Sequence, residues 1–252
     1  MIKNFKTRLR ERKPLFGILL SLPSPEIAEI AADAGFDWLL LDMEHGLLGF
    51  ADVQRMVQAV AGRCPCLVRV SQNEPNMIAK ALDTGAAGLI FPHINRADEA
   101  EACVRAAKYP PRGVRSVGIA RAQGFGGRLQ DSIETDNGRI VLVAQAEHIE
   151  AARNIEDILA VAGIDAVFIG PYDLSASLKR PGRISHPSVR DAIRKVRAGC
   201  AAHKIPCGFF VRSADAAKKA AKAGDALICV GTETTFLGDI ARTVVREVRT
   251  SA

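Results

Sequence analysis

Short apolar runs alternate with amphipathic stretches of helix length along the whole chain, and this alternation limits the possible folds more than any other feature. The runs predict eight strands, at residues 15–20, 37–41, 66–70, 87–91, 140–145, 165–169, 206–211 and 226–230. The stretches between them predict helices at 25–34, 51–61, 75–84, 97–107, 150–160, 187–202 and 213–223, with a last helix after residue 239. Strictly alternating strands and helices require parallel strands with the helices outside. Eight such units in 252 residues favour an α/β fold, a closed (β/α)8 TIM barrel that forms a single domain over residues 1–252.

Four glycines repeat one kind of helix end. Gly35, Gly85, Gly163 and Gly224 each follow a predicted helix and precede a strand by a short turn. Glycine is the residue that most readily ends a helix in this way. No GxGxxG motif follows the first strand, which argues against a dinucleotide-binding fold of the Rossmann type.

Two segments depart from the alternation. Residues 1–14 are strongly basic and predict a solvated helix that leads into the first strand. Residues 108–139 contain two consecutive prolines, six glycines and several arginines, but no convincing strand. They predict a long loop, and such loops in compact domains are more often functional than idle. We expect this loop to lie over the active-site mouth formed by the strand ends.

The composition excludes several classes of protein. No apolar stretch approaches the roughly 20 residues of a membrane helix, and no signal peptide opens the chain, so we expect a cytoplasmic protein with no membrane partner. The six cysteines match no zinc-binding spacing and predict buried, reduced thiols. Much of the net charge of +6 lies in the first 13 residues, and aromatic residues make up 5% of the chain. These features do not suggest a nucleic-acid partner.

Charged side chains follow the predicted strands at the ends that meet at one mouth of a barrel. Glu147 and Asp173 stand just past neighbouring strands and could share one divalent cation, with Arg69 adding positive charge and His45 an imidazole. Each residue alone has a simpler interpretation. Glu147 could be solvated, Asp173 could cap a turn, His45 could be structural and Arg69 could pair with a surface acid.

Several motifs together resemble the HpcH/HpaI aldolase family, whose barrels belong to the wider phosphoenolpyruvate/pyruvate superfamily. The motifs run in order from about residue 16 to residue 237: Leu41-Asp42-Met43-Glu44-His45-Gly46, Val68-Arg69-Val70, Asn73-Glu74-Pro75, Ala81-Leu82-Asp83-Thr84-Gly85-Ala86, Tyr109-Pro110-Pro111-Arg112-Gly113-Val114-Arg115, Asn154-Ile155-Glu156 and Phe168-Ile169-Gly170-Pro171-Tyr172-Asp173-Leu174-Ser175. The resemblance implies a TIM barrel and a class II aldolase. Such an enzyme cleaves 4-hydroxy-2-oxo acids reversibly to pyruvate and an aldehyde, through an enolate held on a divalent metal.

The resemblance also implies roles for individual residues. Glu147 and Asp173 would bind the metal, Mg²⁺ or Mn²⁺ with Co²⁺ as a further option, because hard cations prefer oxygen ligands. Arg69 would donate to the keto or enolate oxygen, where negative charge develops. His45 would be the catalytic base, working with Asp83.

Further contacts are implied around this centre. The segment Gly170-Pro171-Tyr172-Asp173 would hold the substrate carboxylate through backbone N–H groups. Asp42 and Glu44 would bond water or Arg69 behind the metal. The substrate partners would be a 2-oxo acid and an aldehyde. The chain would form a homo-oligomer, a trimer or a hexamer, with the C-terminal helix packed on a neighbouring subunit.

Four positions depart from the family pattern and leave the substrate open. Leu19 replaces a common tryptophan, Ser116 a glycine and Tyr172 a small residue, while His93 adds an imidazole that could contact the acceptor or the enolate. The Pro-His and Arg-Ser pattern is similar to macrophomate synthase. Oxaloacetate decarboxylation, enolate carbon–carbon bond formation like that of macrophomate synthase, and acyl-CoA cleavage are therefore alternative activities. A non-catalytic barrel is a further alternative.

Overall fold

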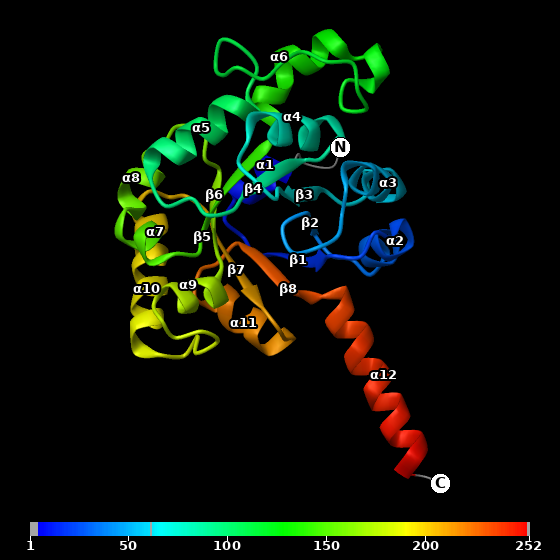
Figure 1. Ribbon diagram of the computed structural model, residues 1–252, viewed down its shortest axis with the longest axis vertical. Helices are drawn as coiled ribbons and strands as arrows, with labels where there is room; N and C mark the ends of the chain where they lie inside the picture. Colours follow the sequence, from blue (N-terminus) through cyan, green and yellow to red (C-terminus); the bar gives the residue numbers. More distant parts are fainter. Residues whose placement is uncertain (1–4, 61, 251–252) are drawn as a thin grey trace.

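The computed structural model describes residues 5–60 and 62–250, which form a closed barrel of parallel strands (Figure 1). Each strand pairs with the next one along the chain, and β8 pairs with β1. The strands are β1 (Leu15–Leu20), β2 (Trp38–Asp42), β3 (Cys66–Arg69), β4 (Gly88–Phe91), β5 (Val141–Ala146), β6 (Ala166–Ile169), β7 (Cys207–Val211) and β8 (Leu227–Thr232). The predicted TIM barrel is confirmed, and its eight strands are those expected from the sequence.

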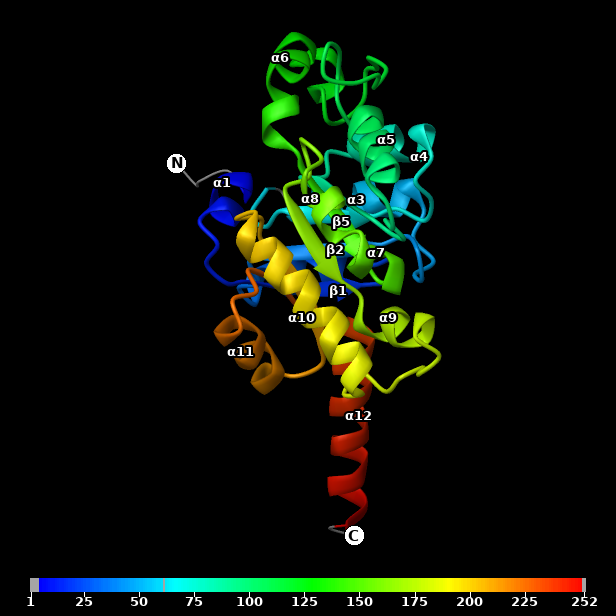
Figure 2. The same cartoon turned by 90° about the vertical axis from the view of Figure 1, so that its left-hand side faces the viewer.

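Helices surround the barrel on the outside (Figures 1 and 2). They are α1 (Phe5–Arg10), α2 (Pro25–Asp33), α3 (Phe50–Val60), α4 (Pro75–Asp83), α5 (Ala97–Ala107), α6 (Leu129–Arg139), α7 (Ile149–Arg153), α8 (Ile155–Leu159), α9 (Pro171–Ser177), α10 (Pro187–Ala202), α11 (Ala214–Lys222) and α12 (Glu233–Thr250), with a 3₁₀ turn η1 (Gly124–Gly126). The glycines expected to end helices all have positive φ, from 90° at Gly35 and Gly85 to 113° at Gly163. This left-handed backbone is where glycine is favoured.

Two helix predictions need adjustment. The helix expected at 150–160 is two short helices, α7 and α8, which meet at Asn154. The Asn154 amide donates to the carbonyl of Asn95 at 2.9 Å, which ties the break to the β4–α5 loop. The last helix, α12, begins at Glu233, before the expected position.

The core has two layers because side chains alternate along each strand. One set fills the barrel interior, where Trp38 packs edge-on against Phe168 with ring centroids 6.4 Å apart and donates to the Leu15 carbonyl at 3.1 Å. The other set, such as Leu39 and Val68, packs beneath the outer helices. All six cysteines are buried and free, as expected.

The segment 108–139 lies at the opposite end of the barrel from the one expected. Helix α5 carries the chain from the end of β4 back to the strand beginnings, and β5 starts there, so the residues between them stay at that end (Figure 1). Arg115 in this segment donates to Asp83 at the end of α4 at 2.7 Å. Within one chain the segment therefore does not cover the mouth. It also contains helix α6 where only a loop was expected.

The two ends of the chain behave differently. Helix α1 lies where the basic lead-in helix was expected, and residues 1–4 of that segment lie outside the described residues. The helix is not fully solvated as expected, because Phe5 and Leu9 are buried and close the N-terminal end of the barrel. Helix α12 extends away from the barrel (Figures 1 and 2) and exposes apolar side chains such as Ile240 and Val248. Among the described residues, no helix is both long enough and apolar enough to cross a membrane.

Candidate active site

A buried arginine is fixed at the C-terminal end of the barrel by the residue opposite it on the next strand. Asp42 ends β2, Arg69 ends β3, and the parallel register pairs the two. Arg69 donates from Nε to Asp42 Oδ1 at 2.8 Å and from Nη2 to Oδ2 at 2.7 Å, a bidentate pair that fixes the guanidinium plane. Its Nη1 lies 3.0 Å from Glu44 Oε2. The guanidinium is therefore held in place before any substrate arrives.

The charge of Arg69 is secured by its neighbours. Burial lowers the pKa of Arg69, but the hydrogen bonds and charge of Asp42, with the charges of Glu44 and Glu147, outweigh this effect and leave the pKa raised. Only 8% of Arg69 is exposed, so its positive charge acts in a region with little water to screen it. A fixed cation of this kind can stabilise an oxyanion in the mouth.

Glu147 follows β5 directly and is almost fully buried, with 2% of its surface exposed. Its Oε1 accepts the backbone N–H of His93 at 2.8 Å, and its Oε2 accepts the side-chain amide of Gln145. Gly170, at the end of the neighbouring strand β6, packs directly against it. A Cβ added at Gly170 would lie 2.9 Å from Glu147 Cβ and 3.0 Å from Oε2, so the position needs a glycine.

Glu44, His93 and Glu147 form a three-residue cluster at the mouth. His93 Nδ1 lies 3.1 Å from Glu147 Oε1, and His93 Nε2 lies 3.2 Å from Glu44 Oε1. One ligand atom from each residue lies within 4.8 Å of the others. Two carboxylates and an imidazole can together hold a divalent cation. The residues present therefore fit a metal site of the kind that the sequence predicted, with Glu147 as the shared ligand.

The electrostatics of the cluster favour a cation. Burial raises the pKa of Glu44; the charge of Arg69 opposes this rise, and that of Glu147 adds to it. Two carboxylates that repel each other in a poorly solvated site are stabilised by a positive ion between them. Sequence reasoning had given Glu44 only the role of bonding water or Arg69. Its position just past β2 mirrors that of His93 just past β4, and that parallel was the available signal.

Asp173, the second predicted metal ligand, lies outside this cluster. It is exposed in the first turn of α9, three residues after Gly170. The segment from Gly170 to Asp173, predicted to bind the substrate, follows β6 and therefore lies at the mouth. Tyr172 packs against Phe210 of β7, with ring centroids 6.5 Å apart. The structure thus brings Glu147 together with Glu44 and His93, and leaves Asp173 on the adjacent turn.

His45 and Asp83 lie at opposite ends of the barrel in one chain. His45 follows β2 at the mouth, where it is exposed and its backbone N–H donates to Asp42 Oδ1 at 3.4 Å. Asp83 ends α4 at the beginnings of the strands and accepts from Arg115 and Gln123. A single chain does not assemble this pair, so it stays a prediction that needs a contact between chains.

The remaining predicted positions divide between the two ends. Leu19 in β1 is partly buried and packs against the barrel interior. Ser116 is exposed in the 108–139 segment, at the end away from the mouth. A role for Ser116 in the pocket of its own chain is therefore not supported by its position.

The chain is similar to known proteins over almost its whole length. The family model described as HpcH/HpaI aldolase/citrate lyase matches residues 15–238. A hydroxypyruvate/pyruvate aldolase of Paraburkholderia phytofirmans is 37% identical over 97% of this chain and 96% of its own length. A 4-hydroxy-2-oxo-heptane-1,7-dioate aldolase of Escherichia coli is 38% identical over 94% of this chain and 91% of its own length. The crystal structure of an HpcH/HpaI aldolase/citrate lyase family protein from Burkholderia cenocepacia superposes with a TM-score of 0.94, at 37% identity, covering 97% of this chain and 98% of that one.

Proposed function

Because the chain belongs to the HpcH/HpaI aldolase/citrate lyase family, we propose that it is a class II aldolase that cleaves 4-hydroxy-2-oxo acids reversibly to pyruvate and an aldehyde. It is a carbon–carbon lyase, in keeping with the aldolases among its relatives. One observation carries the proposal: Arg69, fixed by Asp42, lies beside the carboxylate cluster that fits a divalent metal. A fixed cation next to a metal site is what the developing charge of an enolate requires.

We assign the metal to Glu147, with Asp173 of the adjacent turn as the second carboxylate. Glu44 and His93 each offer a further ligand atom within 4.8 Å of one on Glu147. A bound Mg²⁺ or Mn²⁺ would supply Lewis acidity to the carboxylate and ketone oxygens of the 2-oxo acid. Gln145 and the His93 backbone N–H orient Glu147. Gly170 lets the turn that carries Asp173 approach Glu147 closely.

Arg69 stabilises the keto oxygen, on which negative charge develops during cleavage. When the bond between C3 and C4 breaks, its electron pair stays on C3 and is delocalised onto the keto oxygen at C2. Asp42 holds the guanidinium rigidly, so no reorganisation is needed as the charge appears. The N–H groups of Tyr172 and Asp173 hold the substrate carboxylate in the same mouth.

We assign the proton transfer to His45. Cleavage requires that the 4-hydroxyl lose its proton as the aldehyde forms, and an imidazole is suited to take it near neutral pH. His45 is exposed at the mouth, on the loop that follows Asp42 and also carries Glu44. Its predicted partner Asp83 would come from another chain, in the trimer or hexamer that the sequence implies.

Oxaloacetate decarboxylation is a second candidate. It yields the same enolate by loss of CO₂, and the enolate is then protonated to pyruvate. The observation that favours it is the imidazole of His93, which is 64% exposed at the mouth and close to both Glu44 and Glu147.

The proposal is tested by supplying Mg²⁺ or Mn²⁺, pyruvate and a panel of aldehydes, and by following aldol products by NMR. Oxaloacetate in a parallel assay separates decarboxylase from aldolase. We expect aldol products that disappear with a chelator, and absence of product with every metal would refute the proposal. Metal titrations of Asp173→Asn and Glu44→Gln identify the second ligand. Substitution of the true ligand lowers the metal affinity of the protein by roughly 10- to 100-fold or more. The exposed control Asp191→Asn on α10 leaves the metal affinity unchanged.

A further inference from the structure

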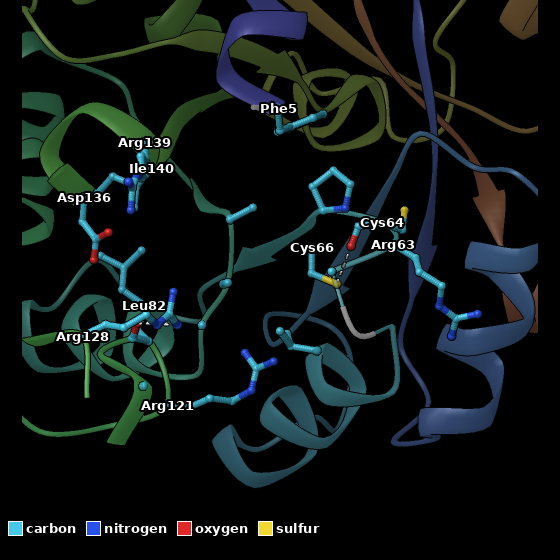
Figure 3. Close-up of a pocket in the computed structure, with 18 of the residues that line it drawn as sticks. Phe5, Arg63, Cys64, Cys66, Leu82, Arg121, Arg128, Asp136, Arg139 and Ile140 are labelled. Carbon is cyan, nitrogen blue, oxygen red and sulfur yellow. Dashed lines mark hydrogen bonds between the residues drawn. The ribbon is translucent and has the colours of Figure 1, made fainter. Parts of the chain in front are cut away.

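A cavity at the N-terminal end of the barrel belongs with the expected contact between chains. Its volume is about 690 Å³, and Arg121, Arg128 and Arg139 are part of its lining (Figure 3). Arg115 also lines it and donates to Asp83 at 2.7 Å. Because Asp83 is the residue expected to complete the active site of a neighbouring chain, this cavity is not separate from that site.

A second cavity, the flank groove, lies on the outside of the barrel between α10 and α11 (Figure 2). Its volume is about 370 Å³, which is enough for a small organic molecule. Phe209 and Val211 on the outer face of β7 line it, whereas Phe210 between them faces the barrel interior. The barrel wall therefore separates the flank groove from the mouth, and nothing in the proposed aldolase activity uses it.

The flank groove is open because α11 places small side chains beside a large aromatic ring. Three alanines of α11 line it, namely Ala216, Ala220 and Ala223. The ring of Phe209 is therefore partly exposed, although the outer ring of helices normally covers this face of a barrel strand. Ile193 of α10 lines the other side. The floor of the groove is apolar and reaches water.

The charged lining of the flank groove is entirely positive. Four cations and no acid line it: Arg190, Arg194, Arg197 and Lys219. Arg194 pairs with Asp191 at 3.0 Å. In the described part of the chain, Arg190 and Lys219 have no carboxylate partner. Cations without counter-charges beside a concave surface attract an anion.

Arg197 is fixed against the floor of the groove. Its Nε donates to Asp225 Oδ1 at 2.9 Å, and its Nη2 donates to Oδ2. Its guanidinium carbon lies 4.7 Å from the centroid of the Phe209 ring. Among the described residues, no acceptor bonds Nη1. Because Asp225 and Phe209 hold the guanidinium in place, Nη1 can meet a ligand on the floor without reorganisation.

We propose that the flank groove binds a small amphipathic organic acid, a molecule with one carboxylate and an apolar ring or short chain. The apolar part covers Phe209 and the alanines of α11, which removes apolar surface from water. Arg190 and Lys219 bind the carboxylate through charge-assisted hydrogen bonds. The ligand lies on the other side of β7 from the metal cluster, so it is distinct from the 2-oxo acid.

Calorimetric titration of the protein in the presence of Mg²⁺ tests the proposal, with phenylacetate and hexanoate as separate probes. We expect saturable binding of at least one probe, and excess pyruvate does not displace it. Phenylacetamide lacks the charge and acetate lacks the apolar part, so each binds at least roughly tenfold more weakly. Displacement of every binding probe by pyruvate would place the probes in the mouth and overturn the proposal.

Variants of α11 locate the binding. Lys219→Met weakens it by roughly tenfold or more, the loss of one charge-assisted hydrogen bond, and Lys219→Arg retains it. Ala216→Leu places a larger side chain in the groove and lowers the affinity by a similar factor. The control Lys218→Met changes the adjacent exposed lysine, which lies 3.8 Å from Asp215 and outside the groove, and leaves the affinity unchanged. Circular dichroism confirms that each variant is folded.

Three further results would contradict the inference. One is that neither phenylacetate nor hexanoate binds at millimolar concentration. Another is equal affinity in Lys218→Met and Lys219→Met. The third is that Ala216→Leu and Lys219→Met change only the oligomeric state seen by light scattering, which would make the flank groove a contact between copies of this chain.

Discussion

Carboxylates at the two ends of the barrel differ in the partners that neutralise their charge. At the N-terminal end, two acids each have a cation and a backbone donor of their own: Asp165 pairs with Lys6 at 2.8 Å and accepts the N–H of Leu142 at 3.1 Å. Asp37 likewise pairs with Arg8 and accepts the N–H of Phe16 at 2.9 Å. At the C-terminal end, Glu44 and Glu147 crowd together and share the imidazole of His93.

The difference separates acids that stabilise the fold from acids poised to bind. The charge of a carboxylate that has its own cation and hydrogen-bond donor is already neutralised. Such pairs at the N-terminal face of a barrel stabilise the fold. Carboxylates that share one partner are only partly neutralised and therefore attract a cation, which is typical of functional sites. Variants of matched residues at the two ends test this difference.

The largest effect is expected from Glu147→Gln against Asp165→Asn. Loss of the Glu147 charge lowers kcat/KM by roughly 1,000-fold, since the metal contributes several kcal/mol to charge stabilisation. Asp165→Asn instead lowers the free energy of unfolding by about 3 kcal/mol, because the buried ion pair between Lys6 and Asp165 is lost, and changes kcat/KM little. Aldol kinetics with and without a chelator, together with urea unfolding, measure both. The comparison fails if the two variants lose activity equally at full metal occupancy.

Next in size is Arg69→Met against Arg197→Met. Both arginines hold a buried aspartate through two hydrogen bonds, Arg69 with Asp42 at the mouth and Arg197 with Asp225 at the start of β8. Each variant leaves that aspartate unpaired and destabilises the fold by about 3 kcal/mol. Only Arg69→Met also lowers kcat, by roughly 100-fold or more. Retention of kcat in folded Arg69→Met would remove the assigned role.

A smaller effect is expected from Gly170→Ala against Gly138→Ala. The added methyl group at Gly170 meets Glu147 within 3.0 Å, so we expect metal affinity to fall by roughly 10- to 100-fold. At Gly138 in α6, a Cβ meets no atom within 4 Å, so alanine raises the free energy of unfolding by about 0.5–1 kcal/mol. Metal titration and thermal unfolding give the two numbers, and unchanged metal affinity in Gly170→Ala would show that Glu147 can move aside.

The smallest effect concerns the pH dependence of Asp136→Asn. Burial raises the pKa of Asp136 above its ordinary value of 3.8, with Arg115 and Arg139 opposing the rise. The folded state therefore favours the neutral carboxyl, a contribution that is complete below 3.8 and is lost as the pH rises through the raised pKa. Asparagine is neutral throughout, so the variant melts higher than the natural protein at pH 7, on the order of one degree. The difference in melting temperature between the two proteins disappears in acid. A difference that instead grew in acid would contradict this prediction.

The sequence predicted the barrel well because its signals are local. Alternating runs and glycines such as Gly35 act within a few residues, and the strands followed them. The position of 108–139 was also within reach, because a segment between a helix and a strand must lie at the strand beginnings. Its length and composition alone suggest a loop over the mouth, whereas its place between a helix and a strand puts it at the strand beginnings.

The site was predicted less completely because side-chain direction depends on distant contacts. Strand ends identified Arg69 and Glu147, but the approach of His93 to both Glu44 and Glu147 depends on a left-handed backbone at His93, with φ 54°. No periodicity predicts that conformation in a residue other than glycine. The hydrogen bond from Arg121 to the Thr84 carbonyl was likewise hidden, because the two residues are 37 positions apart in the chain.

Strand β3 contains four residues, from Cys66 near the N-terminal end of the barrel to Arg69 at the mouth. At about 3.3 Å per residue, three steps span roughly 10 Å. Because Val68 directly precedes Arg69 in this short strand, its backbone amide is close to the mouth without belonging to a charged side chain. The NMR resonance of an isotope-labelled Val68 amide should therefore shift when metal is added, so one backbone resonance can time events at the mouth.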